Sequence, residues 1–324
     1  MRAGEQRRMA RRKRAVVNFQ DALTHLQADR TLLPSALSAL SGADKDQATG
    51  FARVWNRLPV ERRRRAAQEL IDLAEKNVEL DFNALFRHLL DDPDARVRAN
   101  GIEGLWEDED GALVKSFLAF LRDDPDAGVR AVAADAVGRF LLLAEYGRLA
   151  NPSAETLGEV LLATARDLGE DLDVRCHAVE ALGYWSDEIV RSMIAAAYDD
   201  AAPELRASAI AAMGHSADKY WRETVANELQ SPDARTRFHA ARAIGELEHR
   251  DATEALIELL DDPDREVQGA AITALGQVGG KLAQRALAHA AESDDEVLSA
   301  LADDALQELE FNDNSEFLLF DLKE

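Results

Sequence analysis

The chain contains a single cysteine, Cys176, in 324 residues, so a disulfide-stapled fold is excluded. It also lacks any run of about 18 apolar residues, so no transmembrane helix is predicted. Only three apolar residues, 15–17, follow the basic stretch 7–14, and this is too short for the core of a signal peptide. We therefore expect a cytoplasmic location.

Aromatic residues and positive charges are also scarce. Aromatics make up 6% of the chain although hydrophobic residues reach 47%, and the abundance of Ala and Leu favours close helix packing. The chain has 38 Lys and Arg against 61 Asp and Glu, a net charge of −23. Residues 1–80 carry 16 basic and 10 acidic residues, whereas residues 81–324 carry 22 and 51. This acidity argues against nucleic-acid binding by residues 81–324, since they would repel phosphates. It leaves two interpretations open, a soluble surface or a groove for a basic partner.

What the chain does contain is one phrase repeated about every 31 residues. An acidic turn is followed by Val-Arg or a close variant, and then by a helix of small residues that reaches a Gly. The arginines of this phrase are Arg98, Arg130, Arg175, Arg206 and Arg237, and Gln268 continues the series. A period of this length predicts a stack of repeats in which each unit buries its apolar face against its neighbours.

Each repeat carries signals for the start of its second helix. Position zero is Asp92, Asp124, Asp200, Ser231 and Asp262. Pro follows at once in four of these units, which predicts an N-cap at position zero and Pro at the first helical position. Position five is predicted to be a buried anchor, and it is Val97, Val129, Val174, Leu205 and Val267. Position fourteen is Gly in five units, Gly138, Gly183, Gly214, Gly245 and Gly276, which predicts a close helix crossing.

The fold class predicted from these patterns is all-α. We expect an α-α superhelix of roughly seven helical hairpins, whose first helices include residues 82–90, 112–121 and 252–260. Four segments are expected, namely a basic tail at 1–20, a helical cap at 21–80, the repeats at 81–310 and an acidic-aromatic tail at 311–324. Met9 within the basic tail is an alternative first residue. Residues 62–65 are expected on the surface of the cap, and an insertion is expected at 141–154.

The repeated phrase resembles the short HEAT-like repeats of the phycobilin-lyase group over residues 81–310. The resemblance is carried by D-P-D-A-R-V-R at 92–98, D-P-D-A-G-V-R at 124–130 and D-P-D-R-E-V-Q at 262–268. It implies a curved array whose second helices line the concave side. Trp106 in place of Gly and Leu298 in place of Arg depart from the pattern, as expected of terminal units.

The resemblance also implies a ladder of Asp and Arg contacts between neighbouring units. We interpret the arginines as parts of this scaffold, and a ligand-binding role is the alternative. The predicted ladder is Asp92, Arg98, Asp124, Arg130, Arg175, Asp200, Arg206, Arg237 and Asp262.

Helical spacing places positions 8, 11 and 15 of successive second helices on one face. In the central repeats this face carries the most varied chemistry of the chain, so it is the candidate concave binding face. An ordinary solvated face is the alternative. The candidate residues are His177, Glu180, Tyr184, His215, His239 and Arg242.

No metal, cofactor or catalytic site is predicted. The candidate histidines come from three helices about 10 Å apart, which rarely converge on one ion. The iron-binding relatives with this architecture, the deoxyhypusine hydroxylases, use His-Glu dipeptides, and none of the seven His here precedes Glu. Cys176 and His177 are adjacent in a helix and diverge by about 100°, so they cannot pair as nucleophile and base.

The sequence therefore favours a non-enzymatic scaffold that presents a groove to a protein partner, possibly basic in view of the acidic repeats. A subunit for phycobilin attachment, or a chaperone of that type, is the alternative implied by the resemblance. A metal-dependent oxidoreductase or hydroxylase is a second alternative. The basic tail can contact anionic surfaces or fold back on the acidic repeats. The acidic-aromatic tail is either a docking peptide or a cover for the last repeat.

Overall fold

The computed structural model describes residues 18–28, 30–149 and 151–321. All regular structure in these ranges is helical and none of it is strand, which confirms the predicted all-α class. The chain divides into two compact units. The first comprises the described residues of Met1–Asp110 and Asp124–Ala136, and the second comprises Gly111–Asp123 and the described residues of Val137–Glu324.

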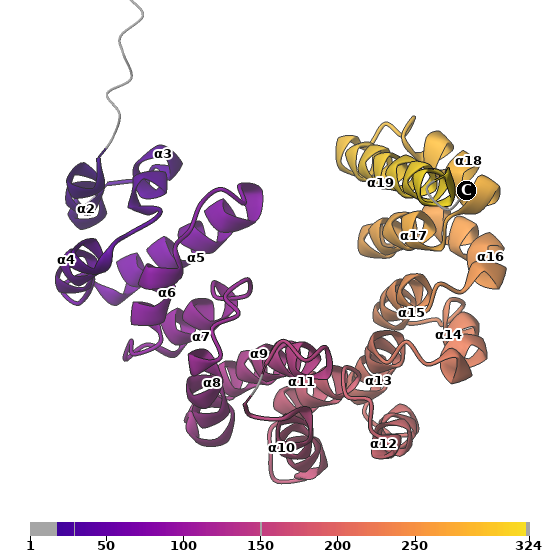
Figure 1. Ribbon diagram of the computed structural model, residues 1–324, viewed down its shortest axis with the longest axis horizontal. Helices are drawn as coiled ribbons and strands as arrows, with labels where there is room; N and C mark the ends of the chain where they lie inside the picture. Colours follow the sequence, from indigo (N-terminus) through magenta and orange to yellow (C-terminus); the bar gives the residue numbers. More distant parts are fainter. Residues whose placement is uncertain (1–17, 29, 150, 322–324) are drawn as a thin grey trace, which may run out of the picture. The chain divides into compact units, whose positions relative to one another are not determined.

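The first unit is built from antiparallel helix pairs whose members contact the equivalent helices of the next pair. Helix α2 contacts α4, and α4 contacts α6; likewise α3 contacts α5, and α5 contacts α7. The residues predicted as a cap thus repeat the layout of the hairpin that follows them (Figure 1). The elements are α2 Phe19–Gln27, α3 Pro34–Leu37, η1 Ser38–Leu40, α4 Lys45–Trp55, α5 Val60–Lys76, α6 Asn83–Leu89 and α7 Ala95–Glu103.

The second unit continues the alternation of a first and a second helix. Its second helices α11, α13, α15, α17 and α19 contact one another in chain order, each lying beside the next (Figure 1). From α6 onward, the described helices form seven successive hairpins, as predicted. The remaining helices are α8 Ala112–Asp123, α9 Ala127–Glu145, α10 Ala154–Arg166, α11 Leu172–Leu182, α12 Glu188–Tyr198, α13 Pro203–His215, α14 Arg222–Glu228, α15 Ala234–Glu246, α16 Thr253–Glu258, α17 Arg265–Val278, α18 Gly280–Ala290 and α19 Glu296–Asp321. Short 3-10 turns lie at η2 Lys219–Trp221, η3 Arg250–Ala252 and η4 Leu259–Asp261.

The repeated apolar and glycine positions build the core. The five predicted anchors at position five are all buried, with exposed fractions of 1% or less. The glycines at position fourteen allow neighbouring second helices to approach closely. A Cβ at Gly214 would lie 2.7 Å from the Cα of Ala243, and one at Gly183 would lie 2.7 Å from the carbonyl oxygen of Ala212. Side chains at these positions would force the helices apart, so the repeat period specifies the spacing of the stack.

The predicted N-caps are wrong by two residues. Helices α7, α15 and α17 begin after the acidic residue at position two, and Asp94, Asp233 and Asp264 accept the capping hydrogen bonds. The residue at position zero instead forms a turn around the proline. Its side-chain oxygen accepts from the N–H of position two, as Asp262 does from Asp264 at 2.8 Å. Because the proline lies within that turn, it precedes the helix rather than starting it.

The insertion and the two terminal segments expected from the sequence differ in how much of each is helical in the described residues. The expected insertion lengthens α9 to Glu145 and adds a connection before α10, whose N-cap is Ser153. Residues 1–17 of the expected basic tail lie outside the described residues, and α2 begins at Phe19. The backbone of residues 311–321 belongs to α19, and residues 322–324 lie outside the description. No helix among the described residues is long and apolar enough to cross a membrane.

Candidate functional site

The second helices carry two kinds of polar contact. One links arginines to the turns between the first and second helices of the hairpins and forms part of the scaffold. The other joins side chains across the faces of α11, α13 and α15, where the sequence places the candidate binding face.

The arginine contacts are regular at two steps of the stack. Arg98 donates from Nε and Nη2 to the two carboxylate oxygens of Asp124, both at 2.8 Å. Arg237 makes the same pair with Asp262 at 2.7 and 2.8 Å. In each case Nη1 also donates to the carbonyl six residues earlier, on Asp92 and on Ser231. Each arginine therefore joins the turn of its own hairpin to the turn of the next hairpin.

Other steps of the predicted ladder depart from this form. Arg206 donates to Glu228 at 2.6 Å, because the next position zero is Ser231, which has no carboxylate. Arg175 donates from Nε to the carbonyl of Ala165 at 3.2 Å. Asp200 accepts from the N–H of Ala202, and Arg130 donates to the carbonyl of Asp124, six residues before it.

The ladder also begins earlier than the repeat pattern indicates. Arg63 of α5 lies 2.9 Å from the carboxylate of Asp92, and its side chain is only 13% exposed. Arg64 donates to Asp94 at 3.0 and 2.6 Å. The expectation that residues 62–65 lie on the surface is therefore wrong for Arg63. In the sequence, a run of four arginines indicates a solvent-exposed helix face. Which of the four is buried depends on how α5 packs against α7.

Three of the six candidate residues lie together between α11 and α13. The rings of Tyr184 and His215 stack with centroids 4.5 Å apart and planes at 11°. Nδ1 of His215 lies 3.1 Å from the carbonyl oxygen of Glu180, and Nε2 lies 3.8 Å from the carboxylate of Glu246. The carboxylate of Glu180 accepts from the hydroxyl of the buried Ser208 at 2.5 Å. His215 thus ties three successive second helices together.

The other three candidates lie to either side of this cluster. His177 is 3.9 Å from Asp173 on its own helix. His239 packs edge-on against Phe238, with centroids 5.2 Å apart, and the guanidinium of Arg242 lies 5.8 Å from the same ring. Phe238 was not among the candidates, although an aromatic residue is uncommon enough in this chain to have marked it.

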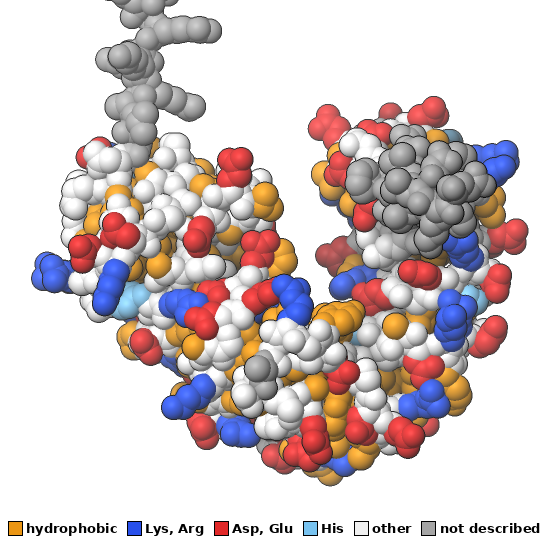
Figure 2. Space-filling model, viewed as in Figure 1, with side chains coloured by type: hydrophobic (Ala, Val, Ile, Leu, Met, Phe, Trp, Pro, Cys, Tyr) orange, Lys and Arg blue, Asp and Glu red, His pale blue; other side chains and the backbone are white. Residues whose placement is uncertain are grey.

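Burial shifts the pKa values of two side chains on this face. Burial raises the pKa of Glu246, and the neighbouring His215 and Arg242 only partly oppose this. Burial, with help from Arg235 and Arg242, lowers the pKa of His239 to about 4. At neutral pH His239 is therefore uncharged. Acidic side chains are spread over the visible surface of both units (Figure 2).

Two adjoining hollows open beside Phe238 on the second helices. The first, about 380 Å³, lies between α15 and the start of α17, and His239, Asp264 and Glu266 line it. The second, about 530 Å³, extends toward α19, and its walls include Arg242, Thr273 and Leu301. Phe238 and Glu266 belong to both. Together the two hollows are lined by apolar side chains, among them Phe238 and Leu301, and by carboxylates and guanidinium groups.

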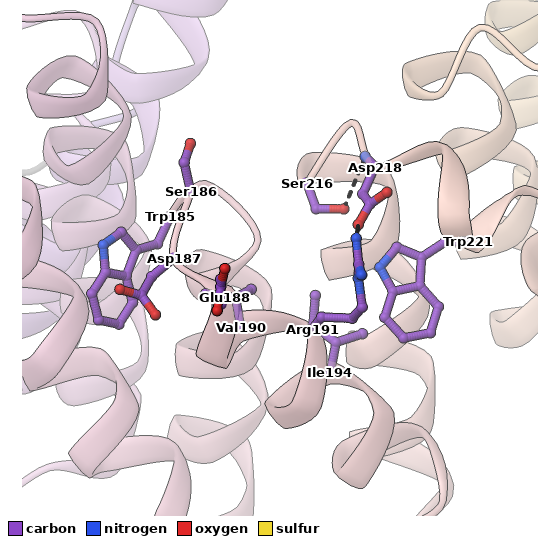
Figure 3. A pocket seen from close by; sticks show the side chains of 10 residues that line it. All are labelled: Trp185, Ser186, Asp187, Glu188, Val190, Arg191, Ile194, Ser216, Asp218 and Trp221. Carbon is purple, nitrogen blue, oxygen red and sulfur yellow. Dashed lines mark hydrogen bonds and ion pairs between the residues drawn. The ribbon is translucent and has the colours of Figure 1, made fainter.

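A further hollow of about 540 Å³ lies among the loops of the hairpins that contain α12 and α14 (Figure 3). Trp185, Val190, Ile194 and Trp221 are its apolar lining residues. Arg191 donates to Asp218 at 3.0 and 2.5 Å, and its guanidinium lies 4.8 Å from the ring of Tyr220. Sequence reasoning missed this hollow because its residues come from connections outside the repeated positions. They are Trp185, Ser186, Asp187, Glu188, Val190, Arg191, Ile194, Ser216, Asp218 and Trp221.

The described residues contain no group of three or more His, Cys, Asp or Glu side chains placed to hold a metal ion. Cys176 is buried, and burial raises the pKa of its thiol, with Glu180 adding to the effect and Ser208 opposing it. The thiol is therefore protonated at neutral pH and is a poor nucleophile.

Comparison with known proteins identifies the repeat type. Residues 222–307 match HEAT repeats. A search of curated proteins found no match. Among solved structures, human deoxyhypusine hydroxylase in complex with glycerol is 17% identical and covers 82% of this chain and 96% of its own, with a TM-score of 0.38. The CpcE–CpcF complex of phycocyanin lyase from a Nostoc species is 18% identical over 70% of this chain and 94% of its own, with a TM-score of 0.47. YibA of Escherichia coli is 19% identical over 82% of this chain and 97% of its own, with a TM-score of 0.40.

The matched residues run from the start of α14 into α19. The layout of these helices recurs in the preceding hairpins, and so does the bidentate arginine contact that joins their turns. Residues 222–307 are therefore HEAT repeats, and the described hairpins before them share their helical layout.

Proposed function

We propose that the protein is a non-enzymatic interaction scaffold that binds a segment of a protein partner along the second helices of its second unit. The binding face comprises the cluster of Glu180, Tyr184 and His215 and the two hollows beside Phe238 on α15 to α19. The observation that carries the proposal is the pair of hollows sharing Phe238 and Glu266. They provide an apolar anchor point with charged groups at its edge, as protein recognition sites commonly do.

The chemistry of this face favours a partner segment that combines an apolar side chain with basic ones. Phe238 and Leu301 can accept the apolar side chain, since both line the hollow that opens toward α19. Glu266 lines both hollows and Asp264 lines the one between α15 and α17, so both carboxylates can pair with lysine or arginine. The acidity of residues 81–324 would steer such a segment and make its association sensitive to salt.

Site-specific photocrosslinking tests this assignment. A photoreactive phenylalanine analogue at Thr273, which lines the hollow and is exposed, should give a covalent product with the partner in extract of the native cells. The same group at Glu254, an exposed position on the first helix α16, serves as the matched control. Products of equal yield at both positions would contradict a specific face.

The partner identified in this way then permits a quantitative test. Glu180→Gln, Tyr184→Ala and Arg242→Ala, singly and together, should weaken its binding at least tenfold in combination, while circular dichroism and thermal unfolding remain close to wild type, since the glutamine amide oxygen can still accept from Ser208. Raising the salt concentration from 50 to 300 mM should also weaken binding. Unchanged affinity in the triple variant would remove the central part of this face from the proposal.

A further inference from the structure

The hollow of about 540 Å³ beside Trp185 and Trp221 lies where the repeat changes. Ser216, which lines this hollow, lies two residues after the Gly of position fourteen. The equivalent residue of the next hairpin is Leu247, which is buried. A serine therefore stands where the next hairpin has a buried leucine, and the smaller side chain leaves room that the leucine fills one hairpin later.

A second residue of the same turn also differs from its equivalent. Asp218 corresponds to His249 of the next hairpin, which is buried, whereas the Asp218 side chain is 31% exposed. One oxygen of Asp218 accepts from Nε and Nη2 of Arg191, which keeps the carboxylate at the surface. This ion pair lies on one side of the hollow, and Trp185 lies on the other (Figure 3).

The apolar lining of the hollow is supplied by two successive hairpins. Val190 and Ile194 of α12 and Trp185 before it come from the first hairpin, and Trp221 comes from the second. All four residues are buried. Packing within the hairpins therefore holds these side chains in place, and the hollow does not need a ligand to form it. Preformed concave sites with an apolar lining and a few polar groups are typical binding sites.

The charged groups around the hollow are mostly acidic. Asp187 and Glu188, at the start of α12, are exposed and form no ion pair with any residue that the structure describes. Asp187 also caps α12, through Oδ1. Arg191 is the basic residue of the lining, and it is already paired with Asp218. Three carboxylates thus accompany one guanidinium group, so the surroundings of the hollow are complementary to a cation.

We propose that this hollow binds a segment of a protein partner in which a leucine-sized apolar side chain is flanked by lysine or arginine. The apolar side chain takes the place that Leu247 fills in the next hairpin and contacts Trp185 and Ile194. The flanking cations pair with Asp187 and Glu188. The hollow lies among the connections of the hairpins, apart from the second-helix face proposed above, so neither proposal depends on the other.

Fluorine NMR of the full chain labelled with 5-fluorotryptophan tests the proposal with a defined probe. The chain has four tryptophans, so each signal can be assigned from a Trp→Phe variant. The probe is an acetylated and amidated tripeptide of lysine, leucine and lysine, titrated at 50 mM salt. The signals of Trp185 and Trp221 should shift saturably, with a dissociation constant of about 1 mM or tighter, and the signal of Trp55 should not. Shifts confined to Trp106, or the absence of any shift, would overturn the proposal.

Two further tripeptides separate the apolar contact from the charge. Glycine in place of the central leucine should weaken binding at least tenfold, because the hollow then remains unfilled. Glutamate in place of both lysines should abolish the shifts, because its carboxylates meet those of Asp187 and Glu188. Equal binding of the leucine and glycine peptides would show attraction by charge alone and would overturn occupation of the hollow.

Variants of the chain locate the site. Ser216→Leu introduces the side chain of the next hairpin, so it should fill the hollow and remove binding while circular dichroism stays as in wild type. Asp187→Asn with Glu188→Gln should weaken binding at least fivefold, and asparagine preserves the N-cap. Undiminished binding by either variant would overturn the proposal. The charge variants decide the question if Ser216→Leu disturbs the fold.

The matched control for the charge variants is Asp251→Asn with Glu254→Gln. These two carboxylates are exposed on the next hairpin and do not line the hollow. Their removal lowers the net negative charge by the same amount, so binding should stay within twofold of wild type. An equal loss in the control would assign binding to the overall charge of the chain and would contradict a specific site.

Discussion

Arg237 on α15 donates from Nε and Nη2 to both carboxylate oxygens of Asp262, in the turn that leads to α17, at 2.7 and 2.8 Å. The Arg237 side chain is 13% exposed and the Asp262 side chain is 5% exposed. Asp262 also accepts the N–H of Asp264, and Arg237 also donates to the carbonyl of Ser231. One buried ion pair therefore joins the turns of two successive hairpins, and Arg98 with Asp124 repeats the arrangement in the first unit.

Removing one partner of this pair should destabilise the second unit. Arg237→Ala leaves the carboxylate of Asp262 buried without its cation, which typically costs about 3 kcal/mol. The loss should be measured by urea unfolding, followed by circular dichroism. Arg265→Ala is the control, because the Arg265 side chain is 58% exposed and that of its partner Asp295 is 33% exposed, so its removal should cost much less. Equal losses in the two variants would show that burial does not set the strength of these contacts.

The same pair makes stability depend on acid pH. The hydrogen bonds from Arg237 lower the pKa of Asp262 below its ordinary value of 3.8, despite the opposing effect of burial. Its contribution to stability is therefore complete above pH 3.8 and is lost as the pH falls through the lower folded-state pKa. Urea unfolding between pH 6 and pH 2 should show a smaller acid-dependent loss in Asp262→Asn than in wild type. Parallel curves would assign the acid sensitivity to other carboxylates.

His239 should cause a second loss of stability at milder acidity. Its pKa in the folded chain is about 4, because burial and the guanidinium groups of Arg235 and Arg242 disfavour the charged ring. The unfolded chain takes up this proton near pH 6.5, so folding stability falls between pH 6.5 and pH 4. A pKa difference of this size corresponds to a loss of about 1–3 kcal/mol in the free energy of unfolding, because the ring keeps partial access to solvent.

The measurement compares wild type with His239→Gln by urea unfolding at pH 7 and pH 4.5. The variant should lose less stability over this interval, whereas His289→Gln should behave as wild type because the His289 side chain is 88% exposed. The ring proton signals of His239 should titrate near pH 4. Titration near pH 6.5 would contradict the assigned environment.

The repeat period correctly predicted the positions that have the same packing environment in every hairpin. Val97 and its equivalents are buried as expected, and Gly214 meets Ala243 of the next second helix, because each residue occupies the same place in every hairpin. The period did not identify Glu228 as the partner of Arg206. When Ser231 replaced the expected Asp, the carboxylate was supplied from a position outside the repeat.

Features that depend on contact between irregular segments could not be predicted. The hollow lined by Trp185 and Trp221 is formed by connections between hairpins, whose lengths vary from repeat to repeat. The N-caps were misplaced for a related reason, since Asp at position zero and Asp at position two are both good caps. Only the turn around the proline decides between them. The stack of Tyr184 on His215 follows from the predicted shared face, but its geometry required the close approach of α11 and α13.

A similarly close approach between α13 and α15 should make Gly214→Ala on α13 destabilising. A Cβ at this position would lie 2.7 Å from Cα of Ala243 and 2.9 Å from its Cβ, so α13 and α15 must separate to admit it. Overpacking of this kind typically costs about 1–3 kcal/mol, which outweighs the gain of about 1 kcal/mol from replacing a helical glycine.

Gly269→Ala on α17 provides a matched control, because the nearest atom to its Cβ would be a side-chain carbon of Leu301 at 3.6 Å. There the helical preference of alanine acts without a clash, so the variant should be more stable than wild type by up to about 1 kcal/mol. Urea unfolding of the two variants should therefore shift in opposite directions. If Gly214→Ala also stabilised the chain, the contact between α13 and α15 would be looser than the structure shows, and the approach of His215 to Glu246 would lose its geometric basis.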